Sequence, residues 1–265
     1  MFPKTATLFV PATVLVAALT AALALNACGR KPAAPADKPA ANDPQTAYAA
    51  PPAVHEVRSG PAGVTVAGTA PAGAQVRLAT PEGQAVFAPV DAQGRFRFDL
   101  PPTNEARIFG LSEKVQGRQV QAQGYLAVGP QGRAAVLRAG AGAARLDPRP
   151  APSLSAVDFD RDGSVVVSGA APAGALIFLR LDGRQAAQVR ADAQGRWTIA
   201  LPQPLSKGVH AIEAAGDSFT NTAQVAIDPP APLAQGPLRS QFTSGALRLD
   251  WLTPGGGVQS TLLLD

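Results

Sequence analysis

The stretch VTVAGTAPAGAQVRLATPEGQAVFAPVDAQGRFRFDLP, residues 64–101, occurs a second time in altered form as VVVSGAAPAGALIFLRLDGRQAAQVRADAQGRWTIALP, residues 165–202. At a constant offset of 101 residues and without a gap, the two stretches agree at 18 of 38 positions. This agreement indicates a duplicated module. The turn residues that recur within it decide the fold.

Short runs of β-forming residues alternate with Gly, Pro and Asp turns in both copies, which is typical of antiparallel strands in a sandwich or barrel. In the first copy Pro71 fixes its own φ and Gly73 supplies a positive φ, so a tight corner is expected there. Glu82-Gly83 and Asp182-Gly183 follow the next β run in their respective copies. Asp-Gly between two β runs predicts a hairpin.

A second shared turn, Asp-Ala-Gln-Gly-Arg, spans residues 91–95 and 192–196. Its Asp side chain can cap the turn and its Gly can adopt the left-handed conformation. The strand that follows carries one aromatic residue at the same place in each copy, Phe96 or Trp197. Period-two alternation predicts that each strand buries one face. The expected buried sets are Phe96, Phe98 and Leu100 in the first copy, and Trp197, Ile199 and Leu201 in the second.

The pattern Val-x-Gly, Ala-Pro-Ala-Gly-Ala, a hairpin, Asp-Ala-x-Gly-Arg-Phe/Trp and a closing Leu-Pro resembles bacterial immunoglobulin-like domains of cell-envelope proteins. It is similar, less closely, to the transthyretin-like regulatory repeats of some carboxypeptidases. Both families are β-sandwiches. The resemblance therefore implies an all-β chain with two tandem immunoglobulin-like β-sandwich modules, and it implies little about function because its motifs are turn motifs.

The N-terminal segment predicts export. Residues 1–27 hold one basic residue, Lys4, followed by a mostly apolar run, which fits a cleaved signal peptide. Leu25-Asn26-Ala27-Cys28 resembles the lipobox of bacterial lipoproteins. That resemblance implies that Cys28 becomes the first mature residue and carries fatty-acyl chains such as palmitate. A plain secretory signal with an incidental cysteine is the alternative. Cys28 is the only cysteine, so no disulfide can form within the chain.

The lipobox resemblance also carries an expectation about location. Gly29 follows the cysteine, whereas Asp at this place favours inner-membrane retention in Gram-negative lipoproteins. An outer-membrane lipoprotein that faces the periplasm or the cell surface is therefore expected. Residues 28–53, rich in Ala and Pro, are predicted to form a disordered tether because they lack the large apolar residues needed for a core.

The rest of the chain divides by composition. Further strand runs are expected at residues 107–111, 119–128 and 134–139, and at 208–215 and 221–227. Residues 246–251 and 258–264 are expected to form one more β-hairpin around Pro254-Gly255-Gly256-Gly257. The predicted boundaries are 1–27 signal peptide, 28–53 tether, 54–140 first sandwich, 141–153 linker, 154–228 second sandwich, and 229–265 Pro-rich link with the C-terminal hairpin.

The C-terminal hairpin carries an alternating apolar set, Leu247, Leu249 and Trp251 with Leu262 and Leu264 across the turn. An isolated two-stranded hairpin is marginal in water, so this one must pack on something. Packing on its own chain is expected because the Pro-rich link is short. Docking on a partner is the alternative.

Charge and motif content argue against several functions. Removal of residues 1–27 takes away Lys4 and no acid, so the formal net charge falls from +4 to +3, and no basic cluster with interleaved aromatics is present. Nucleic-acid binding is not expected. The two histidines, His55 and His210, lie far apart in sequence, and no nucleophile or zinc motif occurs. We expect no catalytic activity and no cofactor.

One acidic cluster suggests a metal site. Asp158-Phe159-Asp160-Arg161-Asp162-Gly163 matches the opening of an EF-hand loop, in which three carboxylates converge on Ca²⁺. The match ends there, because the twelfth position is Gly169 instead of Glu and the following residues form a strand. A turn with solvated acids is therefore preferred over a weak calcium site at Asp158, Asp160 and Asp162.

These inferences lead to one functional expectation and two alternatives. The expected protein is a lipid-anchored binding or structural module of the cell envelope, with an envelope protein or a cell-wall glycan as partner. A scaffold or accessory subunit of a multi-protein transport or secretion complex is the first alternative. A hydrolase is the weaker alternative, since no set of residues supports it.

Overall fold

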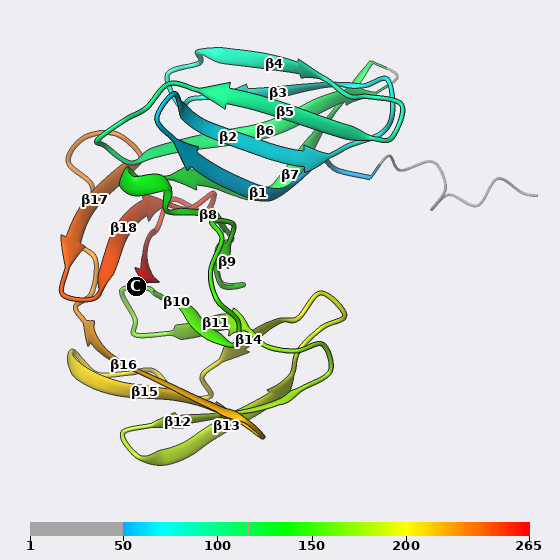
Figure 1. Cartoon of the computed structure of the whole chain (residues 1–265). Coiled ribbons are helices and arrows are strands. Elements are labelled where there is room, and N and C mark those ends of the chain that lie inside the picture. Colours follow the sequence, from blue (N-terminus) through cyan, green and yellow to red (C-terminus); the bar gives the residue numbers. More distant parts are fainter. Residues whose placement is uncertain (1–49, 116) are drawn as a thin grey trace, which may run out of the picture. The chain divides into compact units, whose positions relative to one another are not determined.

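The computed structural model describes residues 50–115 and 117–265, which form an all-β protein of two immunoglobulin-like sandwiches and a C-terminal hairpin, as the sequence predicts (Figure 1). The predicted signal peptide, Cys28 and residues 29–49 of the tether lie outside the described residues. Residues 50–52 lead directly into the first strand, which begins at Ala53, the last residue of the predicted tether.

The first sandwich pairs a three-stranded sheet of order β1-β2-β5 with a sheet of order β4-β3-β6-β7-β8-β9. All of its strand pairs are antiparallel. The strands are β1 (Ala53–Gly60), β2 (Gly63–Thr69), β3 (Gln75–Ala79), β4 (Ala85–Pro89), β5 (Arg95–Leu100), β6 (Arg107–Val115), β7 (Arg118–Val128), β8 (Ala134–Leu137) and β9 (Ala144–Arg145).

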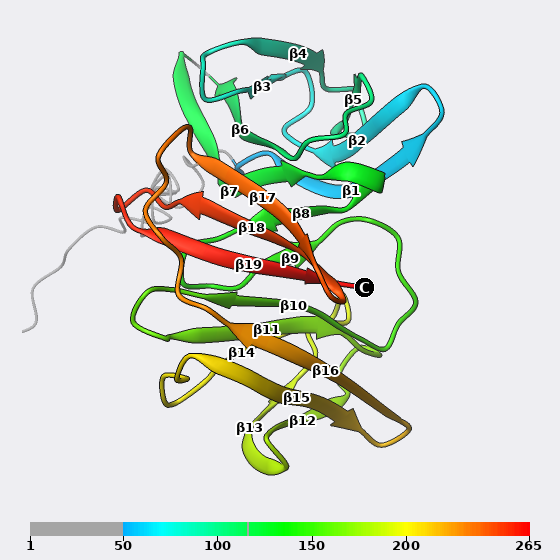
Figure 2. The same cartoon turned by 90° about the vertical axis from the view of Figure 1, so that its left-hand side faces the viewer.

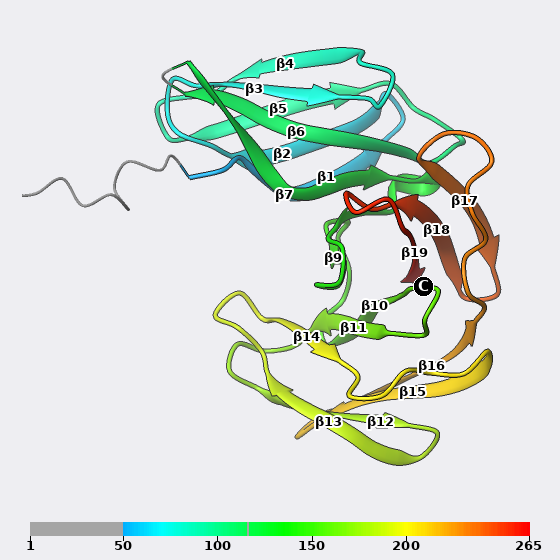
Figure 3. The same ribbon diagram turned by 180° about the vertical axis from the view of Figure 1, so that it is seen from behind.

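The second sandwich repeats this order. Its sheets contain β14-β11-β10 in place of β5-β2-β1, and β13-β12-β15-β16 in place of β4-β3-β6-β7. Figure 3 shows the latter four strands lying together as one layer. The strands are β10 (Ser153–Phe159), β11 (Val165–Ala170), β12 (Leu176–Leu181), β13 (Arg184–Arg190), β14 (Arg196–Ala200), β15 (Gly208–Gly216) and β16 (Phe219–Ile227). The repeat in sequence is therefore a repeat in topology.

The shared turns form as their residues predict. In both Asp-Ala-Gln-Gly-Arg turns the Asp carboxylate accepts hydrogen bonds from the backbone amides two and four residues later. Gly94 and Gly195 both have φ of 75°, which is favourable for glycine. The hairpin residues Asp182 and Gly183 have φ of 49° and 79°, as a two-residue type I′ turn requires.

The glycine of the Val-x-Gly pattern leaves room for the shared aromatic ring. Gly68 on β2 pairs with Phe96 on β5, and Gly169 on β11 pairs with Trp197 on β14. A Cβ atom on either glycine would collide with the aromatic ring opposite and with a backbone carbonyl of the neighbouring strand. The glycine and the aromatic residue are thus one packing unit, which explains why the repeat keeps both.

The predicted alternation is confirmed by burial. In β5 the side chains of Phe96, Phe98 and Leu100 are buried and those between them are exposed. They belong to the core between the two sheets of the first sandwich. Trp197 and Ile199 are buried in the equivalent core of the second sandwich, with Leu201 packed at its margin.

The C-terminal segment forms three strands, β17 (Leu238–Thr243), β18 (Ala246–Leu252) and β19 (Val258–Leu264). The predicted hairpin is β18 and β19, and β17 is an additional strand that the sequence did not indicate. β19 pairs with β10, so the sheet of the second sandwich extends to the order β14-β11-β10-β19-β18-β17. Figure 2 shows β10, β19, β18 and β17 side by side. The hairpin therefore packs on its own chain.

One detail of the predicted hairpin is wrong. Leu247 lies opposite Leu263, while Leu262 and Leu264 lie opposite Arg248 and Ala246. Leu262 and Leu264 thus point to the other face of the sheet, into the core of the second sandwich. The hairpin therefore has two apolar faces instead of the single one expected, because both of its sides are buried.

The second face of the hairpin forms a core of its own with the first sandwich. Leu247, Leu249, Trp251 and Leu263 are buried together with apolar residues of β6, β7 and β8. The indole Nε1 of Trp251 donates to the hydroxyl of Thr261 at 3.1 Å. The C-terminal strands therefore contact both sandwiches. They extend a sheet of the second sandwich and share a hydrophobic core with the first.

The segment predicted as a linker, residues 141–153, takes part in this junction. It contains β9, which pairs with β8, and the buried Ala143 and Leu146. Arg145 donates to the carboxylate of Asp147 at 2.6 Å and to the carbonyl of Leu264 at 2.9 Å. These contacts fix the segment between the sandwiches, so it is ordered backbone.

Candidate functional site

The predicted site residues are separated by the structure. Cys28 lies outside the described residues. Asp158 is inside strand β10 and is buried, which corrects its interpretation as a solvated turn residue. Asp160 caps the following turn by accepting from the backbone amides of Asp162 and Ser164, both at 2.9 Å.

The carboxylates of the acidic cluster therefore serve different partners. Asp162 is exposed, and Asp158 points to the buried junction described below. Within residues 50–115 and 117–265, no group of three or more His, Cys, Asp or Glu is arranged to hold a metal ion.

Asp158 is the centre of a buried polar network at the junction of the sandwiches. Its carboxylate accepts hydrogen bonds from the hydroxyl of Thr261, from the amide of Ala143 at 2.7 Å and from the side-chain amide of Gln259 at 3.1 Å. Burial raises the pKa of Asp158 to about 6, and these hydrogen bonds offset only part of that effect. The network ties β10, β19 and residue 143 together, which is a structural role.

Of the remaining titratable candidates, His210 makes local contacts, whereas both carboxylate oxygens of Glu113 are buried without a hydrogen-bond partner among the described residues. His210 contacts the carboxylate of Asp182 at 2.9 Å and the carbonyl of Ser206 at 3.0 Å. The hydrogen bond with Asp182 raises the pKa of His210. Glu113 is buried on β6, and burial raises its pKa. His210 and Glu113 lie in different sandwiches, so they do not form a shared catalytic site.

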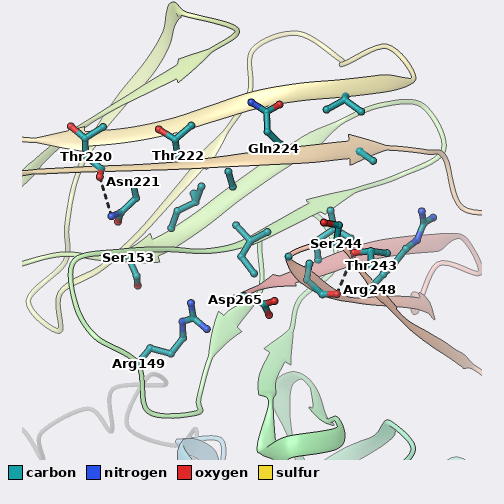
Figure 4. A pocket seen from close by; sticks show the side chains of 18 of the residues that line it. Arg149, Ser153, Thr220, Asn221, Thr222, Gln224, Thr243, Ser244, Arg248 and Asp265 are labelled. Atoms are coloured by element: carbon teal, nitrogen blue, oxygen red, sulfur yellow. Dashed lines mark hydrogen bonds between the residues drawn. The ribbon is translucent and has the colours of Figure 1, made fainter.

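A cleft of about 870 Å³ lies beside strand β16 (Figure 4). We call it the β16 cleft. One wall is β16 itself, from Thr220 to Ala226, and the opposite wall comes from residues 149–154, 243–248 and 262–265. Figure 4 shows Thr220, Thr222 and Gln224 along the strand, with Arg149, Ser153 and Asp265 across from them. Its volume lies within the range typical of ligand sites.

The edge of β16 faces this cleft. Side chains in a strand alternate between faces, so a cleft over one face would be lined by every second residue. The β16 cleft is lined by Thr220, Asn221, Thr222, Ala223 and Gln224 in succession. Among the described residues, β16 is the last strand of its sheet and pairs only with β15, so its other edge offers backbone groups without a strand partner there.

The walls of the β16 cleft carry two polar atoms that are buried yet have no hydrogen-bond partner among the described residues. They are Nε of Arg149 and Oδ1 of Asn221. Burial lowers the pKa of Arg149, and the nearby Arg145 adds to this effect, although an arginine remains a cation. Nε of Arg149 can donate a hydrogen bond to a bound group, and Oδ1 of Asn221 can accept one from it.

The other charges in the β16 cleft are already compensated. Arg248 donates to Asp250 at 2.8 Å and to Ser260 at 2.9 Å. Asp265 pairs with Arg133 at 2.5 Å. Arg149 makes no ion pair within the described residues and is therefore the cation that a ligand would meet.

The sequence did not indicate this cleft. Its walls come from segments far apart in the chain, and they meet only because β19 joins β10. The single sequence signal is the composition of β16, FTNTAQVAI, which has no charged residue although it forms an edge.

Two smaller grooves, of about 530 and 330 Å³, share Arg138, Arg145 and Arg196 on their walls. Arg145 and Arg196 are paired with Asp147 and Asp192. Arg138 donates to the carbonyl of Gly142, so each of the three shared arginines already has a partner within the protein, and the grooves are weaker candidates for a ligand site.

Comparison with known proteins identifies no family. No protein-family model and no curated protein matches the chain. The described residues contain no helix with the length and apolar character needed to span a membrane.

Three solved structures resemble parts of the chain. A carbohydrate acetylesterase from Xanthomonas citri is 30% identical over 25% of this chain and 15% of its own, with a TM-score of 0.23. The BSP domain of a biofilm associated protein is 17% identical over 68% of this chain and 30% of its own, with a TM-score of 0.25. The central fibronectin-III array of RIM-binding protein is 11% identical over 80% of this chain and 88% of its own, with a TM-score of 0.26.

The chain spans only 15% and 30% of the first two of these structures. The fold assignment therefore rests on the strand order and register of the chain itself.

Proposed function

We propose that this protein is a lipid-anchored, non-enzymatic binding module of the bacterial cell envelope. The observation that carries the proposal is the position of the C-terminal strands, which complete a sheet of the second sandwich and share a core with the first. Such a junction suits a protein that holds a binding surface in a fixed orientation.

The anchor in this proposal is Cys28. Acyl chains contribute about 0.8 kcal/mol for each buried methylene, so more than one chain on a single cysteine holds a protein stably at a membrane. Because Gly29 and not Asp follows the cysteine, the proposed location is the outer membrane, with the protein facing the periplasm or the cell surface. The Ala- and Pro-rich residues that follow then separate the sandwiches from the membrane.

The absence of catalysis is part of the proposal. Its support is that the buried carboxylate of Asp158 is held by hydrogen bonds at the junction, and that Glu113 and His210 lie in different sandwiches. The binding partner in the proposal is an envelope protein, because the β16 cleft offers a strand edge. A cell-wall glycan remains the alternative partner.

The anchor is tested by replacing its single acceptor. In the producing bacterium, Cys28→Ala should abolish labelling by radioactive palmitate and leave an unprocessed or soluble chain. A mature-sized Cys28→Ala protein that still fractionates with membranes would contradict the anchor. As a matched variant, Gly29→Asp should keep the palmitate label and move the protein from outer- to inner-membrane fractions on a sucrose gradient.

The second candidate function is a scaffold or accessory subunit of a multi-protein envelope complex. The observation that favours it is again the strand edge, which suits a permanent protein partner as well as a transient one. Mild crosslinking in membranes separates the possibilities. A defined protein complex would favour the scaffold, and cell-wall fragments would favour the glycan-binding module.

A further inference from the structure

The two sandwiches differ at one strand edge. In the first, the last strand of the repeat, β7, is covered by β8, which pairs with Tyr125 to Val128. In the second, no strand within residues 50–115 and 117–265 covers the equivalent strand β16 in this way. Val128 lies opposite Arg107, and Ile227 lies opposite Gly208 at the matching end of its hairpin. The place that β8 fills beside β7 therefore corresponds to the place beside Gln224–Ile227.

The β16 cleft begins at this place. Gln224 and Ala226 line it, and it continues along the edge to Thr220. We infer that the β16 cleft binds an extended segment of a partner protein, which adds to β16 as an antiparallel strand and places a carboxylate against Arg149. This inference rests on the proposed function as a binding module, and it names the site and the class of partner.

The backbone edge favours a peptide over other ligands. An added strand satisfies the row of amides and carbonyls on the free edge of β16, and strand addition of this kind is a common mode of peptide recognition. The other edge strand of the same sheet, β13, carries Arg184 and Arg190 at its ends. Charges of this kind protect an edge against added strands, whereas β16 has none.

The walls define the chemistry of the segment. Ala223, Ala246 and Leu262 are among the apolar residues that line the cleft, and β8, which fills the matching place in the first sandwich, reads AAVL. Small and medium apolar side chains are therefore expected on the face that enters the cleft. Arg149 Nε is buried without a partner, so an acidic residue is expected to pair with it. Proline is excluded from the paired positions because it lacks the amide donor.

Binders are selected from a random octapeptide library. The immobilised target is the Cys28→Ala protein, which contains the folded residues 50–265. Selected peptides should contain Asp or Glu beside small apolar residues, and should lack proline at the paired positions. Hydrogen exchange with and without a selected peptide should show new protection along residues 220–226. Fluorescence anisotropy should show that Arg149→Ala weakens binding by about tenfold or more.

Arg184→Ala is the matched control, since it removes the same charge from the opposite edge of the same sheet. It should leave the affinity unchanged. The inference is overturned if the library yields no binder, if Arg149→Ala binds as tightly as the parent, or if protection falls on β4 or β13. It is also overturned if the protein dimerises without peptide and protects residues 220–226, because the occupant is then a second copy.

These outcomes are independent of the anchor. A Cys28→Ala protein that stays in the membrane contradicts lipidation and leaves peptide binding standing. Failure of peptide binding with correct lipidation contradicts the assigned cleft and leaves the anchor standing.

Discussion

The indole ring of Trp251 on β18 packs edge-to-face against the phenol ring of Tyr125 on β7, with ring centroids 6.0 Å apart and planes at 73°. The two residues are separated by the whole second sandwich in sequence. Trp251 is fully buried by this contact and by the shared core around it. The last strands of the chain are thus packed against the first sandwich.

Removal of the Trp251 ring should destabilise the protein strongly. Trp251→Ala deletes a fully buried aromatic side chain and leaves a cavity, so we expect a loss of about 3–5 kcal/mol in the free energy of unfolding. Urea denaturation measures this loss. Leu252→Ala is the control, because Leu252 is the next residue and is 43% exposed.

Tryptophan fluorescence tests the same packing without removing the Trp251 ring. With Trp197 replaced by Phe, Trp251 is the sole tryptophan, and its emission should be blue-shifted in the purified monomer. A water-like spectrum would mean that the hairpin does not pack on its own chain.

Truncation after Ala234 should destabilise the second sandwich, since it exposes the edge of β10.

Asp158 should give an unusual pH dependence of stability. Its pKa is raised from 3.8 to about 6 in the folded state, so the folded chain keeps a proton that the unfolded chain releases near pH 4. Unfolding between pH 4 and 6 therefore releases a proton, and stability falls as the pH rises through this window. At about 1.4 kcal/mol per pKa unit, the effect is about 3 kcal/mol.

The comparison with Asp158→Asn isolates this effect, because all other titrating groups are common to both proteins. Denaturation at several pH values should show the wild type losing about 3 kcal/mol relative to the variant between pH 4 and 6. Parallel stability curves across that window would show that the carboxyl of Asp158 titrates normally.

The glycines that face the shared aromatic rings should not accept a side chain. Gly68→Ala and Gly169→Ala each place a Cβ atom against a ring and a backbone carbonyl, so a loss of about 1–3 kcal/mol or more is expected. Thermal unfolding measures it. Gly60→Ala is the control, because a Cβ there meets nothing within 4 Å. Equal effects at Gly60 and Gly68 would mean that backbone freedom, and not the ring, requires glycine.

Calcium should not stabilise the fold. The carboxylate of Asp158 is occupied by three hydrogen-bond donors and Asp160 caps its own turn, so they are not free to share an ion. Millimolar calcium should leave the melting temperature unchanged, since only a ligand bound to the native state raises it. A rise of several degrees that Asp160→Ala abolishes would establish a calcium site.

The sequence predicts the sandwiches well because their determinants are local. A turn such as 192–196 is specified by its own Asp and Gly, and the alternation in β5 is visible within six residues. The duplication adds to this by showing which turn residues recur.

The junction is less predictable because its determinants are distant. Asp158 reads as a turn residue from its neighbours, yet it is buried by Gln259 and Thr261, about a hundred residues later. β18 reads as a strand with one polar face, but Arg248 and Asp250 on that face are buried as an ion pair. β17 is not recognisable from the sequence, because it is mostly exposed and only Leu238 and Phe242 of its residues are large and apolar.

Differential scanning calorimetry of the Cys28→Ala protein tests most directly the claim that the C-terminal strands join the two sandwiches into one unit. Because the hairpin shares a sheet with one sandwich and a core with the other, neither should unfold alone. We predict a single transition whose calorimetric enthalpy equals its van't Hoff enthalpy. Two separate transitions, one for each sandwich and unaffected by Trp251→Ala, would contradict the account.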